Sequence, residues 1–484
     1  MLEKGLWFII ALLFSFFLSQ GSWIPAIAIL GGILFVAALT AGLYPMAILL
    51  LVGPATFFVF LNSYLNAIPF ATMERIIFLT LLSLTLIKIC LKQGNRTKLV
   101  PVEILMMFFL SYTLISLITT FEDKALFTWL SKDVSLYFQG YFMPMATFMI
   151  IRRLPWSEEK IELLFKFVIA AGAFLGLTSI LQLFLGLSIF IPDYMTLGLH
   201  TQERALGTFT NASEYGLVLS VFILIGIFMY TRTKDLMLKI LLMSCLALMA
   251  VGLILSKTRA PWLGALLSLA FIFLYDKRVR PLLITSTGCA TLIGIIIAPF
   301  VLDLDSFSTR VLEITPILNR LAVWIAALNM MAQNPILGIG FGKDSFKNII
   351  SDYAVNIGPI SGNWASKISE PHNELLFIAS HTGILGAIIY FFIFLHIFKI
   401  LRAIHKSPSS AKFEKDISLY MGAVFICFFS NALLVDIGIF NYSFLLMYFL
   451  FGIASIFYAN EKDQVQFFKP PKLGVAKIKP DYRT

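Results

Sequence analysis

The segment Glu370-Pro371-His372-Asn373-Glu374 closes the only long polar interval of the chain, residues 306–373. Two further segments precede it in the same interval, residues 319–324 (NRLAVW) and residues 334–342 (NPILGIGFG). On both sides of the interval the sequence consists of apolar runs separated by short polar turns. The chain therefore divides into a hydrophobic scaffold and one large polar loop.

Composition indicates the class of the scaffold. Hydrophobic residues make up 59% of the 484 residues and charged residues 13%, which leaves too little polar surface for a soluble protein and indicates a polytopic membrane protein. The net charge of +10 does not indicate nucleic-acid binding, because Lys and Arg fall in short runs between apolar segments, where the positive-inside rule accounts for them. The four cysteines show no paired spacing and predict no disulfide framework.

An apolar run needs roughly 20 residues to cross a bilayer as a helix. By this criterion the sequence contains about fourteen candidate spans, of which the first two are short. They centre near Phe14, Leu30, Leu51, Leu82, Phe109, Met143, Ala171, Val221, Leu248, Leu267, Ile295, Ile388, Phe425 and Leu446. We expect an all-α polytopic membrane protein with about 12–14 transmembrane helices and one large extracytoplasmic loop that carries short helices.

The expected chain has four parts. Residues 1–301 form an N-terminal transmembrane bundle of about 11 spans, and residues 302–371 form the large extracytoplasmic loop. Residues 372–460 add about three C-terminal spans, and residues 461–484 form a basic cytoplasmic tail. Every second loop carries a cluster of Lys and Arg, so both termini are expected in the cytoplasm and the large loop outside.

Several arginines lie in loops that this topology places outside, where the positive-inside rule does not predict them. They are Arg204, Arg259, Arg310 and Arg320. A guanidinium group binds phosphate through two parallel hydrogen bonds and stays charged. Arg204, Arg259 and Arg320 converging at the outer surface would suit a pyrophosphate at the depth of the lipid headgroups. The alternative is that each arginine pairs with a lipid headgroup or a nearby acid.

Within the large loop, the residues around Arg320 carry the pattern of an amphipathic helix. Asn319 can cap its start and Asn334-Pro335 can stop it, with Arg320 in the first turn. Its apolar residues recur at helical spacing, namely Leu321, Trp324, Ile325, Leu328 and Met331. We expect this helix to lie on the membrane, with an apolar face that serves either packing or binding.

His372 is the candidate general base. Ser369 can cap a helix in which Pro371 suits the first turn and His372 follows it. The positive end of the helix dipole disfavours an imidazolium ion, so the ring would be neutral and could accept a proton from a hydroxyl. The alternative is a histidine that only hydrogen-bonds to the loop.

The sequence predicts no bound metal and no cofactor. His372 and His381 are nine residues apart, which at about 100° per residue puts them on opposite faces of one expected helix. No cluster of Cys, His, Asp and Glu with ligand spacing occurs elsewhere in the sequence. The segment Gly338-x-Gly340-x-Gly342-Lys343 lacks the strand context and the spacing of a P-loop, and we interpret it as a flexible turn.

Several short motifs follow one another in a recognisable order. They are Arg204-Ala205-Leu206-Gly207-Thr208-Phe209-Thr210-Asn211, Ser256-Lys257-Thr258-Arg259-Ala260, Arg320-x-x-x-Trp324, Asn334-Pro335-Ile336-Leu337-Gly338-Ile339-Gly340, Pro371-His372-Asn373-Glu374-Leu375 and Gly383-x-x-Gly386. Their order, spacing and topology resemble the bacterial O-antigen ligase and O-antigen polymerase superfamily, most strongly over residues 204–388. The N-terminal region departs from it, because this chain has about two extra spans there.

The resemblance implies a metal-independent, inverting glycosyltransferase of the C type in the bacterial cytoplasmic membrane. Such enzymes take a glycan from undecaprenyl pyrophosphate on the outer face of the membrane and pass it to a hydroxyl. By carry-over, His372 would be the base on the acceptor hydroxyl, and Arg204 and Arg320 would hold the pyrophosphate. Arg259 and Asn373 would be further substrate-binding candidates. The implied partners are the lipid-linked glycan, a glycan or lipid acceptor, membrane lipids and other polysaccharide assembly proteins.

Four alternatives differ in what the chain does with the glycan. A polymerase, which we favour, joins lipid-linked repeat units, and a ligase transfers the glycan to a lipid or cell-wall acceptor. A transporter of polysaccharides or small molecules would place ionisable residues near the bilayer midplane, whereas Lys88, Glu103, Glu162 and Lys166 lie toward span ends. A non-catalytic scaffold of an export complex would not need His372.

Overall fold

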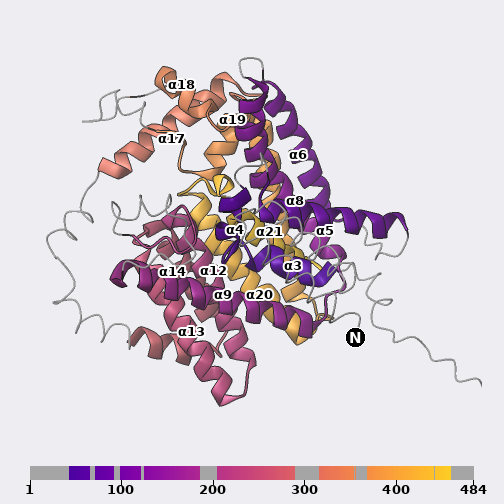
Figure 1. The fold of residues 1–484 in the computed structure, drawn as a ribbon, viewed down its shortest axis with the longest axis vertical. Helices are drawn as coiled ribbons and strands as arrows, with labels where there is room; N and C mark the ends of the chain where they lie inside the picture. Colours follow the sequence, from indigo (N-terminus) through magenta and orange to yellow (C-terminus); the bar gives the residue numbers. More distant parts are fainter. Residues whose placement is uncertain are drawn as a thin grey trace, which may run out of the picture.

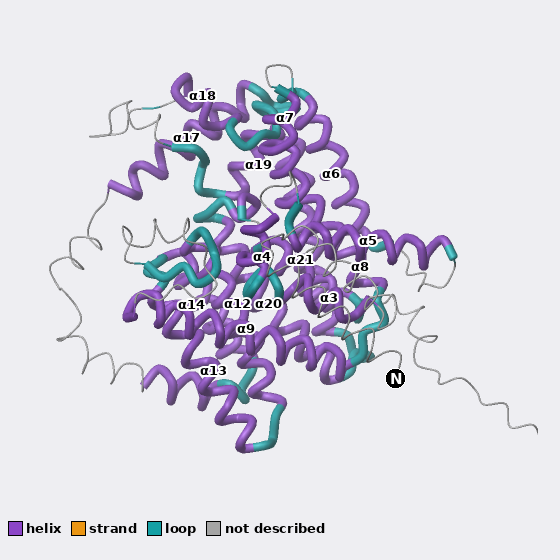
Figure 2. The backbone as a smooth tube through the Cα atoms, in the orientation of Figure 1, coloured by secondary structure: helices purple, strands orange, loops and turns teal. Residues whose placement is uncertain are grey.

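The computed structural model describes residues 43–65, 71–91, 99–121, 125–185, 204–288, 315–353, 355, 368–440 and 442–458. In these ranges the chain is helical with connecting turns and contains no strand (Figure 2). The expectation of an all-α protein is confirmed.

The helices form one bundle with a smaller helical group at one end (Figure 1). Those of the first half are α3 (Leu43–Val52), α4 (Phe58–Leu65), α5 (Met73–Cys90), α6 (Pro101–Ile118), α7 (Leu126–Trp129), the π-helical η1 (Leu130–Val134) and η2 (Tyr137–Phe142), α8 (Met143–Arg153) and α9 (Glu158–Leu185). Those of the second half are α12 (Ala212–Arg232), α13 (Leu236–Leu255), α14 (Arg259–Tyr275), α17 (Thr315–Gln333), α18 (Ser345–Tyr353), α19 (Glu374–Lys406), α20 (Lys412–Ala432), η4 (Ile437–Ile439) and α21 (Ser443–Ser455).

Six segments of the described chain are long and apolar enough to cross a membrane. They are Pro101–Ile118, Leu126–Arg153, Glu158–Phe184, Ala212–Arg232, Leu236–Leu255 and Glu374–Lys406. The polytopic class is therefore confirmed, while the number of spans stays a prediction. The candidate spans near Phe14, Leu30 and Ile295 lie outside the described residues, as do Arg310, the rest of residues 302–314 and 356–367 of the predicted loop, and the whole predicted tail.

Helices at the centre of the bundle are more buried than helices at its surface. The apolar window of α12 is 89% buried, whereas that of α13 is 28% buried. Because both helices are hydrophobic, α12 packs among other helices and α13 exposes side chains such as Leu241 and Ile254 to its surroundings. An apolar helix with an exposed apolar face is what a lipid environment requires.

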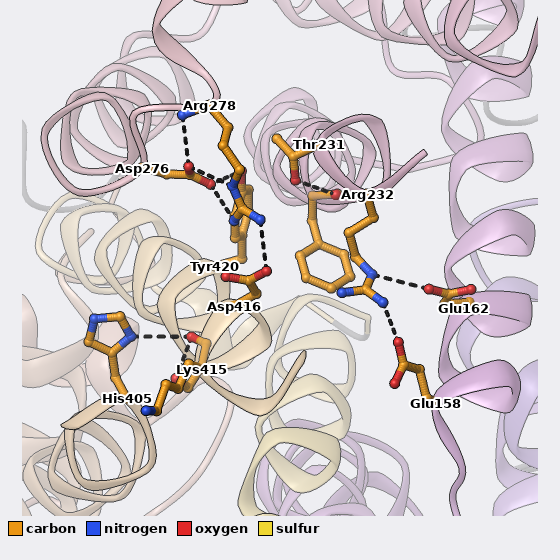
Figure 3. A network of polar contacts seen from close by, with 12 residues as sticks. Glu158, Glu162, Thr231, Arg232, Asp276, Arg278, His405, Lys415, Asp416 and Tyr420 are labelled. Carbon is orange, nitrogen blue, oxygen red and sulfur yellow. Dashed lines mark hydrogen bonds and ion pairs between the residues drawn. The ribbon is translucent and has the colours of Figure 1, made fainter. Parts of the chain in front are cut away.

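Arginine–carboxylate bonds tie the helices together at one end of the bundle, which we call the basic end (Figure 3). Arg232, the last residue of α12, contacts Glu158 and Glu162 of α9. Arg278, just after α14, contacts Asp276 at 2.8 Å and Asp416 of α20 at 2.9 Å. These bonds fix the ends of four helices beside the loops that the sequence analysis identified as basic.

The opposite end, which we call the site end, is where α12, α14 and α19 begin. There α17 and α18 pack against α19 through Val323, Ala326, Met330, Phe346 and Leu376. The helix α17 begins at Thr315, earlier than the sequence suggested, and ends at Gln333 as Asn334-Pro335 predicts. The face that we predicted to be apolar includes Leu321 and Leu328, which are exposed, because a second face packs on the protein.

The loop of residues 334–342 forms a turn, as expected, and is inserted beside a break in α19. Gly383 interrupts α19 with φ +72°. Its neighbour Ile384 donates its N–H to the Pro335 carbonyl at 2.9 Å, and Ile339 donates to the Ser380 carbonyl at 2.9 Å. The loop thus supplies hydrogen bonds that the broken helix cannot make internally.

Glycine is required at the point of closest approach. Gly338 has φ +66°, and a Cβ there would lie 2.4 Å from the Ser380 carbonyl oxygen. That distance is well inside van der Waals contact, and the positive φ disfavours any other residue. Gly338 therefore allows the loop after α17 to pack closely on the backbone of α19.

Candidate functional site

His372 is held by a buried carboxylate from a distant part of the chain. Asp436 lies between α20 and α21 and is 2% exposed. Its Oδ2 accepts the backbone N–H of His372 at 2.7 Å, and its Oδ1 accepts that of Asn373 at 2.7 Å. A buried carboxylate needs such donors to offset its lost hydration. The loop that precedes α19 is therefore fastened to the loop that precedes α21.

These bonds change the start of the helix that the sequence predicted. Asn373, not Ser369, is the N-cap, and its Oδ1 accepts the N–H of Leu376 at 3.1 Å. The helix begins at Glu374, so the expectation that His372 lies in its first turn is wrong. His372 instead has φ +53°, a conformation that costs a residue with a Cβ roughly 1–2 kcal/mol and that the two bonds to Asp436 stabilise.

The imidazole of His372 is favoured in its neutral form, for a reason other than its place in a helix. Its side chain is half-exposed, and Nδ1 lies 3.7 Å from Asp436 Oδ2. The pKa of His372 is lowered from its ordinary value, first by partial burial and then by the positive charge of Arg320. A neutral ring with an exposed edge can accept a proton from a bound hydroxyl.

Arg320 on α17 and Arg259 on α14 lie close enough for their charges to interact. Arg320 is half-buried on α17, and its pKa is lowered by burial and then by the charge of Arg259, an effect that Asp436 partly offsets. Arg259 is the first residue of α14, where the helix dipole adds positive potential. Two nearby guanidinium groups produce a positive potential that attracts anions. This arrangement is suited to binding a phosphate or pyrophosphate.

Arg204 lies on a loop that packs beside the turn carrying Arg259. Ala205 donates its N–H to the Leu255 carbonyl at 3.0 Å, which joins this loop to the last residue of α13. The next helix is joined to the same turn, because a Cβ on Gly216 would lie 2.9 Å from Pro261. The structure therefore brings the Arg204 loop to the site end and leaves its side chain exposed.

Asn373 is placed beside His372 but its amide is already engaged. Its Oδ1 caps α19, and its Nδ2 donates to the Leu433 carbonyl at 3.1 Å. The residue is 7% exposed. Of the sequence-predicted set, the structure thus brings His372 and Arg320 near Asp436 and Arg259 near Arg320, and it gives Asn373 contacts that fix the loop.

Sequence reasoning missed Asp436, although a signal was present. It is the only Asp, Glu, Lys, Arg or His between residues 417 and 460. A lone ionisable residue within so apolar a stretch is a functional-site hypothesis. The pKa of Asp436 is raised well above its ordinary value, first by burial and then by the charges of Glu374 and Glu370.

Glu374 stabilises the loop that contains Asp436. It is fully buried, its Oε1 accepts hydrogen bonds from the hydroxyls of Tyr141 at 2.8 Å and Tyr390 at 3.1 Å, and its Oε2 accepts the N–H of Gly438 at 2.8 Å. Tyr141 belongs to the π-helical η2, and Gly438 follows Asp436 by two residues. The position of Asp436 is thereby fixed relative to α19. Within the described ranges no group of three or more His, Cys, Asp and Glu is arranged to hold a metal ion.

Comparisons with known proteins agree on one family. The profile of the family described as O-Antigen ligase matches residues 244–391, a range that includes Arg259, Arg320 and His372 but not Arg204 or Asp436. A protein of Rickettsia felis named "Putative polysaccharide ligase" is 24% identical over 143 residues, which is 29% of this chain. The matched stretch spans about a third (34%) of that relative's length. The resemblance stated from the order of motifs is confirmed.

Proposed function

Because residues 244–391 belong to the O-antigen ligase superfamily, we propose that this chain is a membrane glycosyltransferase of polysaccharide assembly. The proposed donor is a glycan carried on undecaprenyl pyrophosphate, and the proposed acceptor is a hydroxyl of a second glycan or lipid. The proposed reaction takes place at the site end, which we expect on the extracytoplasmic side because the positive-inside rule assigns the basic loops to the cytoplasm.

One observation carries this proposal: His372, whose pKa is lowered by burial and by Arg320, lies near Arg320, and the charge of Arg320 in turn interacts with that of Arg259. His372 supplies a proton acceptor, and Arg320 with Arg259 supplies concentrated positive charge. A transfer from a pyrophosphate to a hydroxyl requires both, because a proton must leave the attacking oxygen while negative charge develops on the leaving group.

The proposed transfer step needs no reactant other than the donor and the acceptor. The acceptor hydroxyl gives its proton to His372 as its oxygen forms a bond to the anomeric carbon. The bond from that carbon to the pyrophosphate oxygen breaks, and its electron pair stays on the pyrophosphate, which Arg320, Arg259 and Arg204 stabilise. Attack opposite to the leaving group inverts the anomeric centre. General base catalysis of this kind contributes roughly 10²–10⁴-fold.

In this mechanism Asp436 stabilises the protonated form of His372. Asp436 Oδ2 lies 3.7 Å from Nδ1, so the positive charge that forms when His372 takes the proton favours ionisation of Asp436, and the two opposite charges then attract each other. The guanidinium groups provide the charge that a metal ion provides in other transferases, and the proposed mechanism is accordingly metal-independent.

The chemical identity of the acceptor distinguishes ligation from polymerisation. Both comparisons carry the name of a ligase, and this favours transfer of the glycan to a lipid or cell-wall acceptor. Polymerisation of lipid-linked repeat units, the function that the sequence analysis favoured, uses the same chemistry with another lipid-linked glycan as acceptor. Either product is compatible with the proposed site.

The test is complementation of a host strain deleted for this gene with wild type, His372→Ala or His405→Ala at matched membrane levels. His405 lies exposed at the basic end and serves as the control. We expect His372→Ala to lose transfer by at least about 10²-fold and His405→Ala to retain it. Accumulation of single lipid-linked repeats would identify a polymerase, and polymers that fail to reach their final anchor would identify a ligase. Wild-type glycan from His372→Ala would overturn the proposal.

A further inference from the structure

One peptide unit of the site is held from both sides. The carbonyl of Pro371 accepts a hydrogen bond from the indole Nε1–H of Trp324 at 3.1 Å. The N–H of the same peptide bond, on His372, donates to Asp436 Oδ2 at 2.7 Å. The two partners come from different parts of the chain, α17 and the loop before α21. Because a peptide unit is planar, bonds to its two ends fix the orientation of the whole plane.

This orientation determines where the imidazole of His372 points. Its φ of +53° is sparsely populated for residues with a Cβ and persists only where surrounding contacts hold it. Release of the Pro371 carbonyl would leave the peptide plane free to rotate on that side. The ring would then depart from the position that it occupies next to Arg320 and Asp436.

Trp324 also lies on the helix that carries Arg320. The two residues are four positions apart, so they lie one above the other on the same face of α17. Another face of α17 packs tightly on the protein, because Val323, Ala327 and Met330 are fully buried against α18 and α19. One rigid helix therefore positions an arginine directly and the histidine loop through a hydrogen bond.

We propose that Trp324 is a positioning residue, which holds the Pro371 carbonyl so that the base on His372 and the cation on Arg320 keep a fixed separation. This inference rests on the proposed function, since it assigns His372 and Arg320 to one reaction. Alignment of a base with the group that binds the leaving anion matters for rate far more than for binding, because displacement of a reacting group mainly lowers the frequency of productive encounters.

The test is Trp324→Phe, which removes the N–H donor and keeps an aromatic ring of similar shape. Trp156→Phe is the matched control, because Trp156 donates its Nε1–H to the Ile151 carbonyl at 2.9 Å at the far end of α8. With purified enzyme in lipid discs and lipid-linked glycan extracted from the host, we expect Trp324→Phe to lower kcat about ten-fold. The KM for the donor should change less than about two-fold, and Trp156→Phe should match wild type.

A double-variant comparison separates positioning from simple support of the fold. If Trp324 acts through His372, Trp324→Phe will lower the residual rate of His372→Ala by less than about two-fold, because the two changes remove one function. An equal ten-fold loss in both backgrounds, or wild-type kcat for Trp324→Phe, would overturn the positioning role. Full activity of His372→Ala alone would instead overturn the proposed function, so the two failures are distinguishable.

Discussion

The two ends of the bundle use arginine in opposite ways. At the basic end, Arg278 contacts Asp276 and Asp416 within 2.9 Å, and Arg232 contacts two glutamates of α9 (Figure 3). At the site end, Arg320 lies near a second arginine, which lowers its pKa together with burial. Charge at the basic end is neutralised within the protein and joins helices. At the site end two arginines from different helices lie close together, and we propose that their charge binds an external anion.

The largest loss of activity is expected from Arg320→Gln at the site end. Removing this guanidinium should lower kcat/KM for the lipid-linked donor about 10²-fold, because a charge aimed at the leaving group is worth several kcal/mol in the transition state. Initial rates over a range of donor concentrations measure the effect. Wild-type kcat/KM would show that the paired arginines do not bind the donor.

The same variant has a second, pH-dependent consequence. In the wild type, burial and Arg320 lower the pKa of His372 below its ordinary value of about 6.5, so the neutral base persists into mildly acidic solution. Arg320→Gln removes the second of these influences and should raise that pKa, which moves the acid limb of the pH–rate profile to higher pH. Arg320→Lys keeps the charge and should leave the limb in place. If the acid limb of Arg320→Gln stays at the wild-type pH, the charge of Arg320 does not influence the pKa of His372.

A smaller effect is expected when Asp436 becomes Asn. One of the two backbone N–H groups that Asp436 accepts would then face an amide NH₂, and an unsatisfied buried donor costs roughly 1–3 kcal/mol. We expect a lower melting temperature and a transfer rate reduced about ten-fold, because the His372 loop loses part of its attachment. Asp416→Asn at the basic end is the control, and equal losses of transfer in both variants would contradict a specific role for Asp436.

The smallest effect is expected from Arg278→Gln at the basic end. Arg278 is about a third exposed, with 36% of its side-chain surface accessible, and partly exposed ion pairs contribute roughly 0–1 kcal/mol. Thermal unfolding should shift by a few degrees at most, and transfer per folded molecule should stay at the wild-type level. A loss of transfer greater than about five-fold, which exceeds what 0–1 kcal/mol corresponds to, would mean that the two ends are coupled.

The sequence alone was sufficient for the class of protein and for its family. Apolar runs predict membrane helices because transfer of a segment into lipid depends on that segment's own composition. The order of short motifs pointed to the superfamily, and to His372, Arg259 and Arg320, because each chemical group can be recognised from the residue itself. These inferences need no knowledge of which segments meet in space.

The tertiary structure decided which groups act on His372. Asp436 is 64 residues away along the chain, and its bonds to two backbone N–H groups moved the start of α19 to Glu374 against the local signal of Ser369 and Pro371. Likewise, Gly338 is required by a contact with Ser380 across a broken helix. A buried polar group takes whichever partner the packing provides, so neither outcome is a property of the neighbouring sequence.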